Sequence, residues 1–140
     1  MFKVFLLGMA FVILPAASQT LTFEGMKTFS NKVNKQFMGT QVDEITTIKN
    51  VNVILEDSTV NVILTFNISI IKSSFDINKM KKYDSKMGQA FCEDIKIFLN
   101  NDNVDEIVIN TSYIFSDYET FTNRVKCDYK AIKKALLSER

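Results

Sequence analysis

The sequence predicts an α+β domain, a two-layer sandwich in which a four-stranded antiparallel sheet made of two hairpins carries two helices on one face. Two observations predict this fold class. Apolar residues recur every three or four positions in two segments, which is the period of an amphipathic helix. They recur every second position in four shorter segments, which is the period of a strand with one buried face. The segments follow in the order α-β-β-α-β-β, and a short C-terminal helix is expected after them.

The first 18 residues have the pattern of a signal peptide. The basic residue Lys3 precedes an apolar run (4–14), and small residues occupy positions 16–18. A charged start, a short apolar centre and small residues at the cleavage site are what a signal peptidase requires. The apolar run is shorter than the roughly 20 residues that span a bilayer. Residues 1–18 are therefore expected to be removed on export, which leaves one domain (19–140) with no stable membrane anchor.

The first helix and the first hairpin follow from residue spacing. Apolar side chains at helical spacing lie between Phe23 and Phe37, and Gly39 is suited to end that helix. Alternating apolar residues then occupy 51–55 and 60–70, separated by a polar turn at 56–58. The two runs are expected to pair as a hairpin with one buried face and one largely polar face.

The second helix is predicted within residues 75–101. Asp76 is suited to cap its start, an apolar stripe follows, and lysines occupy the far side. The stripe comprises Ile77, Met80, Tyr83 or Asp84, Met87, Phe91, Ile95 and Phe98. Because Cys92 borders this stripe, we expect its side chain to face the sheet.

The second hairpin is predicted after the polar residues 100–103, with its turn at 116–119. The inward residues of its first strand are Ile107, Ile109, Thr111, Tyr113 and Phe115, and those of its return strand are Phe121, Val125, Cys127 and Tyr129. Residues 129–137 are expected to form the short C-terminal helix.

The two cysteines are expected to form a disulfide. The helical period places Cys92 on the buried side of the second helix, and the strand period places Cys127 on the buried side of the last strand. An exported chain meets an oxidising environment, in which two cysteines favour a bridge. The alternatives are a pair of unpaired buried thiols and a reactive thiol, for which the chain offers no activating histidine.

The composition limits partners and chemistry. Residues 1–18 hold one basic and no acidic residue, so their removal leaves 16 basic and 16 acidic side chains. A nearly neutral chain without a basic stripe is a poor match for nucleic acid, whose binding depends on neutralising phosphates. The chain has no histidine, which is the commonest general base and a common zinc ligand. We therefore predict no nucleic-acid partner, no metal, no cofactor and no enzymatic activity.

Uncharged polar residues recur on the strand side opposite the apolar one. With one isoleucine they form a candidate partner-binding sheet face: Asn61, Ile63, Thr65, Asn67, Asn110 and Ser112. Two interpretations stay open, namely an ordinary solvated sheet face and a surface on which a partner protein docks.

The region from Cys92 to Cys127 combines a cysteine on a helix, an acidic and asparagine-rich connection, and a hairpin with Tyr113 and Phe115 that ends in the second cysteine. This arrangement resembles small exported bacterial α/β proteins, including type II secretion pilotins, which have a helix-to-strand disulfide. Pilotins are lipoproteins that bind a tail segment of the secretin and deliver it to the outer membrane, and this chain lacks the lipobox cysteine. A helix packed on a sheet also resembles cystatins, whose Gln-x-Val-x-Gly loop is absent here.

The expected function is that of an exported, non-enzymatic protein-binding domain of the cell envelope, adaptor or pilotin-like, periplasmic or secreted. Its expected partner is another envelope or secreted protein. Two alternatives stay open. One is a periplasmic carrier of a small apolar ligand, with a cavity lined by Phe66, Met80, Met87 and Phe91; the other is a cystatin-like secreted inhibitor.

Overall fold

The structure, a computed structural model, describes residues 22–95 and 103–127, which form an α+β fold of two layers. The elements in chain order are α2 (Phe23–Phe37), β1 (Thr46–Glu56), β2 (Thr59–Ile68), the 3-10 turn η1 (Lys72–Ser74), α3 (Ile77–Asp94), β3 (Glu106–Ile114) and β4 (Thr120–Lys126). The fold class expected from the sequence is confirmed. The predicted signal peptide (1–18) and C-terminal helix (129–137) lie outside the described residues.

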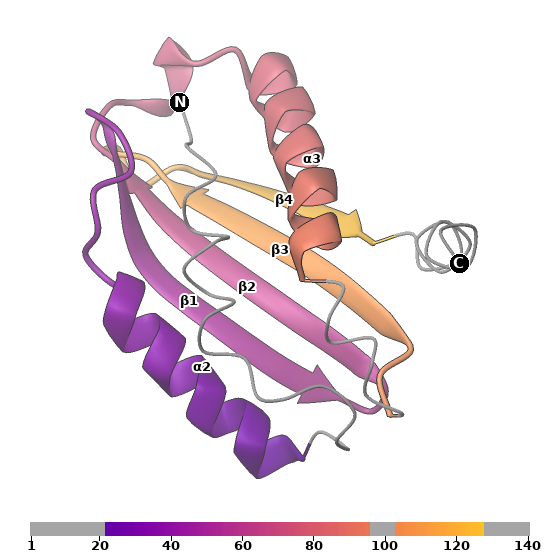
Figure 1. The fold of residues 1–140 in the computed structure, drawn as a ribbon. Helices are drawn as coiled ribbons and strands as arrows, with labels where there is room; N and C mark the ends of the chain where they lie inside the picture. The colour runs from indigo at the N-terminus through magenta and orange to yellow at the C-terminus, as the bar shows by residue number, and fades with distance from the viewer. Residues whose placement is uncertain (1–21, 96–102, 128–140) are drawn as a thin grey trace.

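The four strands form one sheet in the order β1-β2-β3-β4 (Figure 1). The hairpins β1–β2 and β3–β4 are antiparallel, but the central pair β2–β3 is parallel. The expectation of a wholly antiparallel sheet is therefore wrong at this pair. The physical reason is α3, which returns the chain to the end of the sheet where β2 begins, as a parallel crossover requires.

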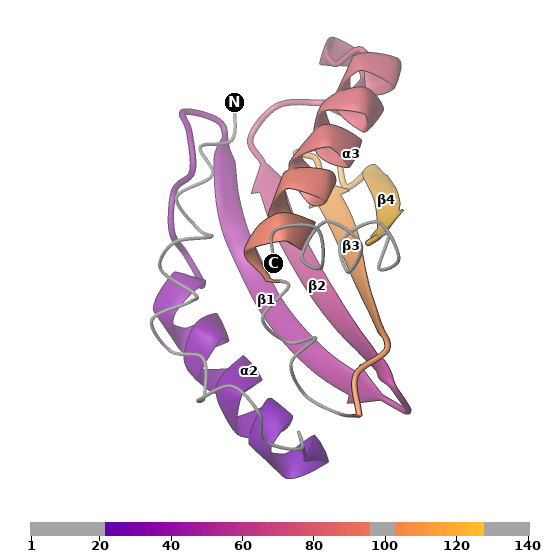
Figure 2. The same ribbon diagram turned by 45° about the vertical axis from the view of Figure 1, so that its right-hand side comes forward.

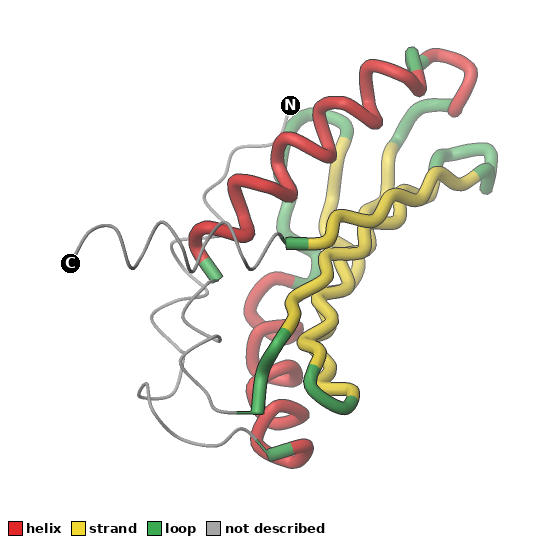
Figure 3. Tube along the Cα trace, turned by 90° about the vertical axis from the view of Figure 1, so that its right-hand side faces the viewer, coloured by secondary structure: helices red, strands yellow, loops and turns green. Residues whose placement is uncertain are grey.

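Both helices lie on the same face of the sheet (Figure 3). Figure 2 shows α2 along β1 and α3 toward the side of β3 and β4. Thr22 caps α2 by accepting from the N–H of Gly25, and Asp76 caps α3, as predicted, by accepting from the first N–H groups of that helix. Gly39, just past α2, has a φ of 86°, a conformation that glycine adopts without strain.

The core fills the space between the helices and the inner face of the sheet. Tyr113 and Phe115 are its largest fully buried side chains. The Tyr113 ring lies between two phenylalanines, with centroid distances of 5.2 Å to Phe66 and 5.9 Å to Phe121. Burying each side chain of this size stabilises the fold by roughly 1.5 to 3 kcal/mol. The inner face is thus a largely apolar layer, which leaves the outer face for other contacts.

Candidate functional site

The outer face of the sheet, opposite the helices, is the candidate binding surface. No helix or strand among residues 22–95 and 103–127 covers it (Figure 3). The structure places on it all six residues predicted to bind a partner: Asn61, Ile63, Thr65 and Asn67 from β2, and Asn110 and Ser112 from β3. The parallel register makes Ile63 the direct neighbour of Asn110, and Thr65 the direct neighbour of Ser112. The central strand pair therefore gathers these six residues into one area.

Asparagine and aliphatic side chains alternate in both directions across the middle of this face. In one row Ile63 lies between Asn52 and Asn110, and in the next row Asn61 lies between Ile54 and Val108. We call these six residues the checkerboard: Asn52, Ile54, Asn61, Ile63, Val108 and Asn110. Asparagine is depleted in β-strands, so strand propensity does not explain its repeated use here.

Charged side chains stand on the β4 side of the outer face. Arg124 is the cross-strand neighbour of Asn110, and Lys126 is that of Val108. The ammonium nitrogen of Lys126 lies 3.6 Å from Oε2 of Glu106. By contrast, none of the outward residues within 50–54, 61–67 and 108–114 is charged. The face is therefore an uncharged area with a positive border along β4.

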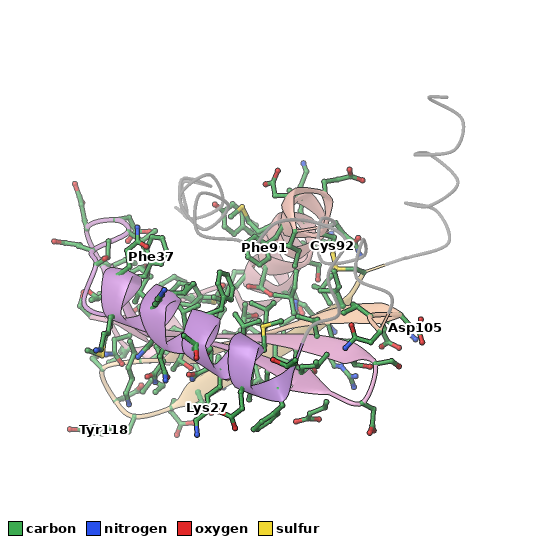
Figure 4. The ribbon with its side chains drawn as sticks, turned by 60° about the horizontal axis from the view of Figure 1, so that its bottom comes forward. Lys27, Phe37, Phe91, Cys92, Asp105 and Tyr118 are labelled. Carbon is green, nitrogen blue, oxygen red and sulfur yellow. A yellow bond between two sulfur atoms is a disulfide. The ribbon has the colours of Figure 1, made fainter. Side chains whose placement is uncertain are left out.

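The predicted disulfide joins Cys92 near the end of α3 to Cys127 directly after β4. The S–S distance is 2.08 Å and the two Cα atoms are 5.5 Å apart. Both residues are buried, and Figure 4 shows the bond between the sulfur atoms beside Cys92. Because both sulfurs are used in the bridge, the prediction of a structural disulfide is confirmed, and neither cysteine is a free thiol.

A buried carboxylate joins α3 to the sheet, and the sequence did not assign it a role. Asp84, only 4% exposed, accepts at Oδ1 from the hydroxyl of Tyr113 at 2.5 Å. Its Oδ2 accepts from Thr111 Oγ1 at 2.7 Å and from Asn123 Nδ2 at 2.8 Å. The Asn123 amide also donates to Ser85 Oγ at 3.1 Å. We call these five residues the Asp84 cluster; its donors to the carboxylate come from both β3 and β4.

Within the Asp84 cluster, the phenol of Tyr113 keeps its proton. Burial in the core, and then the neighbouring charge of Asp84, raise the pKa of Tyr113 far above its usual value of 10.0. The phenol therefore stays protonated and donates to the carboxylate at all physiological pH values. Because the carboxylate receives several hydrogen bonds, its burial is compensated. The cluster acts as a polar cross-link inside the domain, and its reactive groups are shielded from solvent.

The sequence contained a signal for this cluster. The stripe of the second helix left Tyr83 or Asp84 as alternatives, and the structure turns Asp84 inward while Tyr83 is partly buried. Thr111 and Asn123 interrupt the otherwise apolar inward positions of their two strands. Polar residues at inward positions of neighbouring elements indicate that they hydrogen-bond to one another, because a buried polar group without a hydrogen-bond partner destabilises the fold.

The residues proposed to line a ligand cavity lie in or against the core. Phe66 and Met80 are buried, and Met87 and Phe91 are partly buried against it. Phe91 lies next to Cys92 on α3, as Figure 4 shows. Among residues 22–95 and 103–127, there is no group of three or more side chains of the metal-binding types placed to hold an ion.

The disulfide is relevant to the compartment in which the protein resides. A buried disulfide is compatible with an oxidising, exported location. Within the part of the chain that the structure describes, neither helix combines the length and apolar character needed to span a membrane. In comparisons with known proteins, no family model, no curated protein and no solved structure matches this chain.

Proposed function

We propose that this protein is an exported, non-enzymatic protein-binding domain of the cell envelope, with the outer face of its sheet as the binding surface. The observation that carries this proposal is the uncharged middle of that face, formed by the checkerboard and the adjoining pair Thr65–Ser112. All of these residues are partly exposed except Val108, which is fully buried. The central parts of protein interfaces are depleted in charged residues. Covering this area removes no charge from water, and its amide groups supply hydrogen bonds to the partner.

The proposed partner is another envelope or secreted protein, bound in the manner of an adaptor such as a pilotin. The disulfide supports this location because disulfides typically form and persist in oxidising compartments. It also supports the role, because it fixes α3 against β4 and so stiffens the sheet that presents the surface. A rigid surface loses less conformational entropy when a partner binds.

A charge placed in the middle of the outer face tests this proposal. Ile63→Lys puts an ammonium group between Asn52 and Asn110, where a bound partner would have to desolvate it. The control is Lys27→Glu, a charge change at an exposed position of α2 (labelled in Figure 4). Both side chains are outside the buried core, so both variants are expected to fold.

Wild type and both variants are immobilised and incubated with native envelope extract, and retained proteins are measured by quantitative mass spectrometry. We expect at least one protein that wild type and Lys27→Glu retain equally and that free wild-type domain displaces. Ile63→Lys should reduce its retention about tenfold or more, which corresponds to about 1.4 kcal/mol. Equal retention by Ile63→Lys would contradict the proposed surface. A small apolar molecule released from all three proteins, with no retained protein, would instead support the carrier alternative.

A further inference from the structure

The two edges of the sheet differ in how their main-chain groups are paired, and the chain itself pairs the outer edge of β1. At the start of that strand, the N–H of Gly39 donates to the carbonyl of Ile48 at 2.8 Å. The N–H of Ile48 donates in turn to the carbonyl of Thr40 at 2.9 Å. The connection between α2 and β1 therefore occupies this part of the edge.

Further along β1, side chains of α2 pair with the outward main-chain groups of the strand. The N–H of Val51 donates to Oδ1 of Asn34, and the N–H of Val53 donates to Oγ of Ser30, each at 2.8 Å. Both contacts link residues that are far apart in the chain. The helix thus uses two polar side chains to satisfy outward main-chain donors, and a strand added to β1 there would have to displace them.

The outer edge of β4 is built differently. The N–H of Cys127 donates to the carbonyl of Ile107, and the N–H of Phe115 donates to the carbonyl of Glu119. In an antiparallel ladder hydrogen-bonded pairs alternate, so the odd-numbered residues of β4 direct their main-chain groups toward β3. The even-numbered residues therefore direct theirs away from the sheet.

The outward groups form an open stretch at Thr122, Arg124 and Lys126. Among residues 22–95 and 103–127, no main-chain or side-chain group pairs with them. At the start of the strand the edge is closed, because Nζ of Lys72 donates to the carbonyl of Thr120 at 2.8 Å. The open stretch can accept the hydrogen-bond ladder of one further strand.

Positive side chains lie along the outer-face side of this open stretch and near its start on the helix side. Arg124 and Lys126 lie on the outer face of the sheet, where Glu106 balances part of the charge of Lys126. On the helix side, Ser85 is hydrogen-bonded to β4, and Lys81 lies one helical turn before Ser85 on the same side of α3. An extended chain seated here would pass close to several cationic groups.

We propose that the outer edge of β4 binds an extended acidic segment of a partner protein, which joins the sheet as a fifth strand. This inference rests on the proposed protein-binding function and specifies a second contact for it. The main-chain groups of the open stretch provide the ladder, and the flanking cations select carboxylates over ammonium groups. A second copy of this chain is a poorer occupant, because a two-fold pairing of β4 strands centred on Arg124 would bring like charges directly opposite each other.

Synthetic peptides test this binding mode on the full-length, oxidised protein. The probe is a fluorescent ten-residue peptide of alternating Val and Glu, and its control has Lys in place of every Glu. Two further acidic peptides carry N-methyl groups on every Val or on every Glu. Fluorescence anisotropy should show the acidic peptide binding about tenfold or more tighter than the basic one. One N-methyl pattern should abolish binding and the other preserve it, because only alternate N–H groups face β4.

Two substitutions at position 124 separate the contribution of main-chain hydrogen bonding from that of side-chain charge. Arg124→Pro removes an outward N–H that the fold does not use, and proline is tolerated on edge strands. Arg124→Thr removes the same charge but keeps the N–H. We expect Arg124→Pro to bind the acidic peptide about tenfold more weakly than Arg124→Thr. Hydrogen exchange should slow at Thr122, Arg124 and Lys126 on binding, whereas that at Val51 and Val53 should not change.

Several results would overturn the inference. They are equal affinities for acidic and basic peptides, equal binding by Arg124→Pro and Arg124→Thr, unchanged exchange at the open stretch, and no binding at about 1 mM peptide. A dimer that protects the same amides without peptide would assign the edge to a second copy and also overturn it. Ile63→Lys distinguishes the two proposals. It should weaken retention of a partner through the outer face, whereas binding of the acidic peptide at the β4 edge should be preserved.

Discussion

Gly88 in α3 lies directly against Val125 in β4, so that a Cβ atom added at Gly88 would stand 2.6 Å from Cγ2 of Val125. One helical turn further along α3, Cys92 is bonded to Cys127, two residues past Val125. The missing side chain lets the helix approach the edge strand, and the disulfide holds it there.

Gly88→Ala is expected to destabilise the domain, against the usual effect of this change in a helix. Alanine normally gains up to about 1 kcal/mol over glycine in a helix interior. Here the added methyl group would overlap a buried, β-branched side chain, and such overpacking costs about 1 to 3 kcal/mol. Urea unfolding measures the effect, with Gln89→Ala, at the exposed neighbouring position, as the control. A more stable Gly88→Ala protein would show that the helix can move away at little cost.

Removing the disulfide with Cys92→Ser and Cys127→Ser together is expected to cost about 3 to 4 kcal/mol of unfolding free energy. The bond closes a loop between residues separated by 35 positions, and the estimate follows from the chain entropy of a loop of that length. Mass spectrometry without reductant should find the wild-type chain about 2 Da lighter than after reduction. Thermal unfolding of the double variant should match that of reduced wild type. An unchanged melting temperature would mean that the bond contributes nothing to stability.

Tyr113 is expected to make the protein sensitive to alkali. Burial, and then the charge of Asp84, raise the pKa of Tyr113 in the folded protein above its usual 10.0. Above that pH the unfolded chain loses the phenolic proton while the folded chain keeps it. The stability contributed by this group is therefore fully present below pH 10.0 and falls as the pH rises, by about 1.4 kcal/mol per pH unit.

Urea unfolding between about pH 9 and about pH 11 checks this expectation. Tyr113→Phe should lose stability less steeply than wild type over this range. Tyr118→Phe is the control, because the Tyr118 side chain is 87% exposed and lies outside the core. Equal slopes for wild type and Tyr113→Phe would show that the buried phenol does not govern the alkaline transition.

Ser30→Ala is expected to weaken the pairing of α2 with β1. The change leaves the buried N–H of Val53 without its acceptor, which costs about 1 to 3 kcal/mol. Amide exchange at Val53 should become faster, and the protein should aggregate more readily because an edge donor is freed. Asn31→Ala, at the exposed neighbouring position, should leave both properties unchanged. Slow exchange at Val53 in Ser30→Ala would indicate that another group takes over as acceptor.

Side-chain periodicity predicted where the elements lie and which faces they bury, but it did not predict the direction of strand pairing. The second strand, expected at 60–70, is found at Thr59–Ile68, and both cysteines face inward as the two periods require. Parallel and antiparallel strands share the same alternation of side chains, so alternation alone cannot separate them. The available signal was the helix between the second and third strands, which is long enough for a parallel crossover.

Asp84 shows why buried polar contacts are harder to predict. An apolar stripe of period 3.6 accommodates either Tyr83 or Asp84 at that turn of the helix. The choice depends on Thr111 and Asn123, which are 27 and 39 positions away in the chain. No local pattern contains that information, because it exists only once the two strands and the helix are packed together.

The outer edge of β1 is less accessible to a further strand than the outer edge of β4. Between Thr46 and Val53 the chain's own helix and loop occupy the places that a neighbouring molecule would need. A strand that joined this part of the edge would first have to displace those contacts, whereas the open stretch of β4 presents no such obstacle among the described residues.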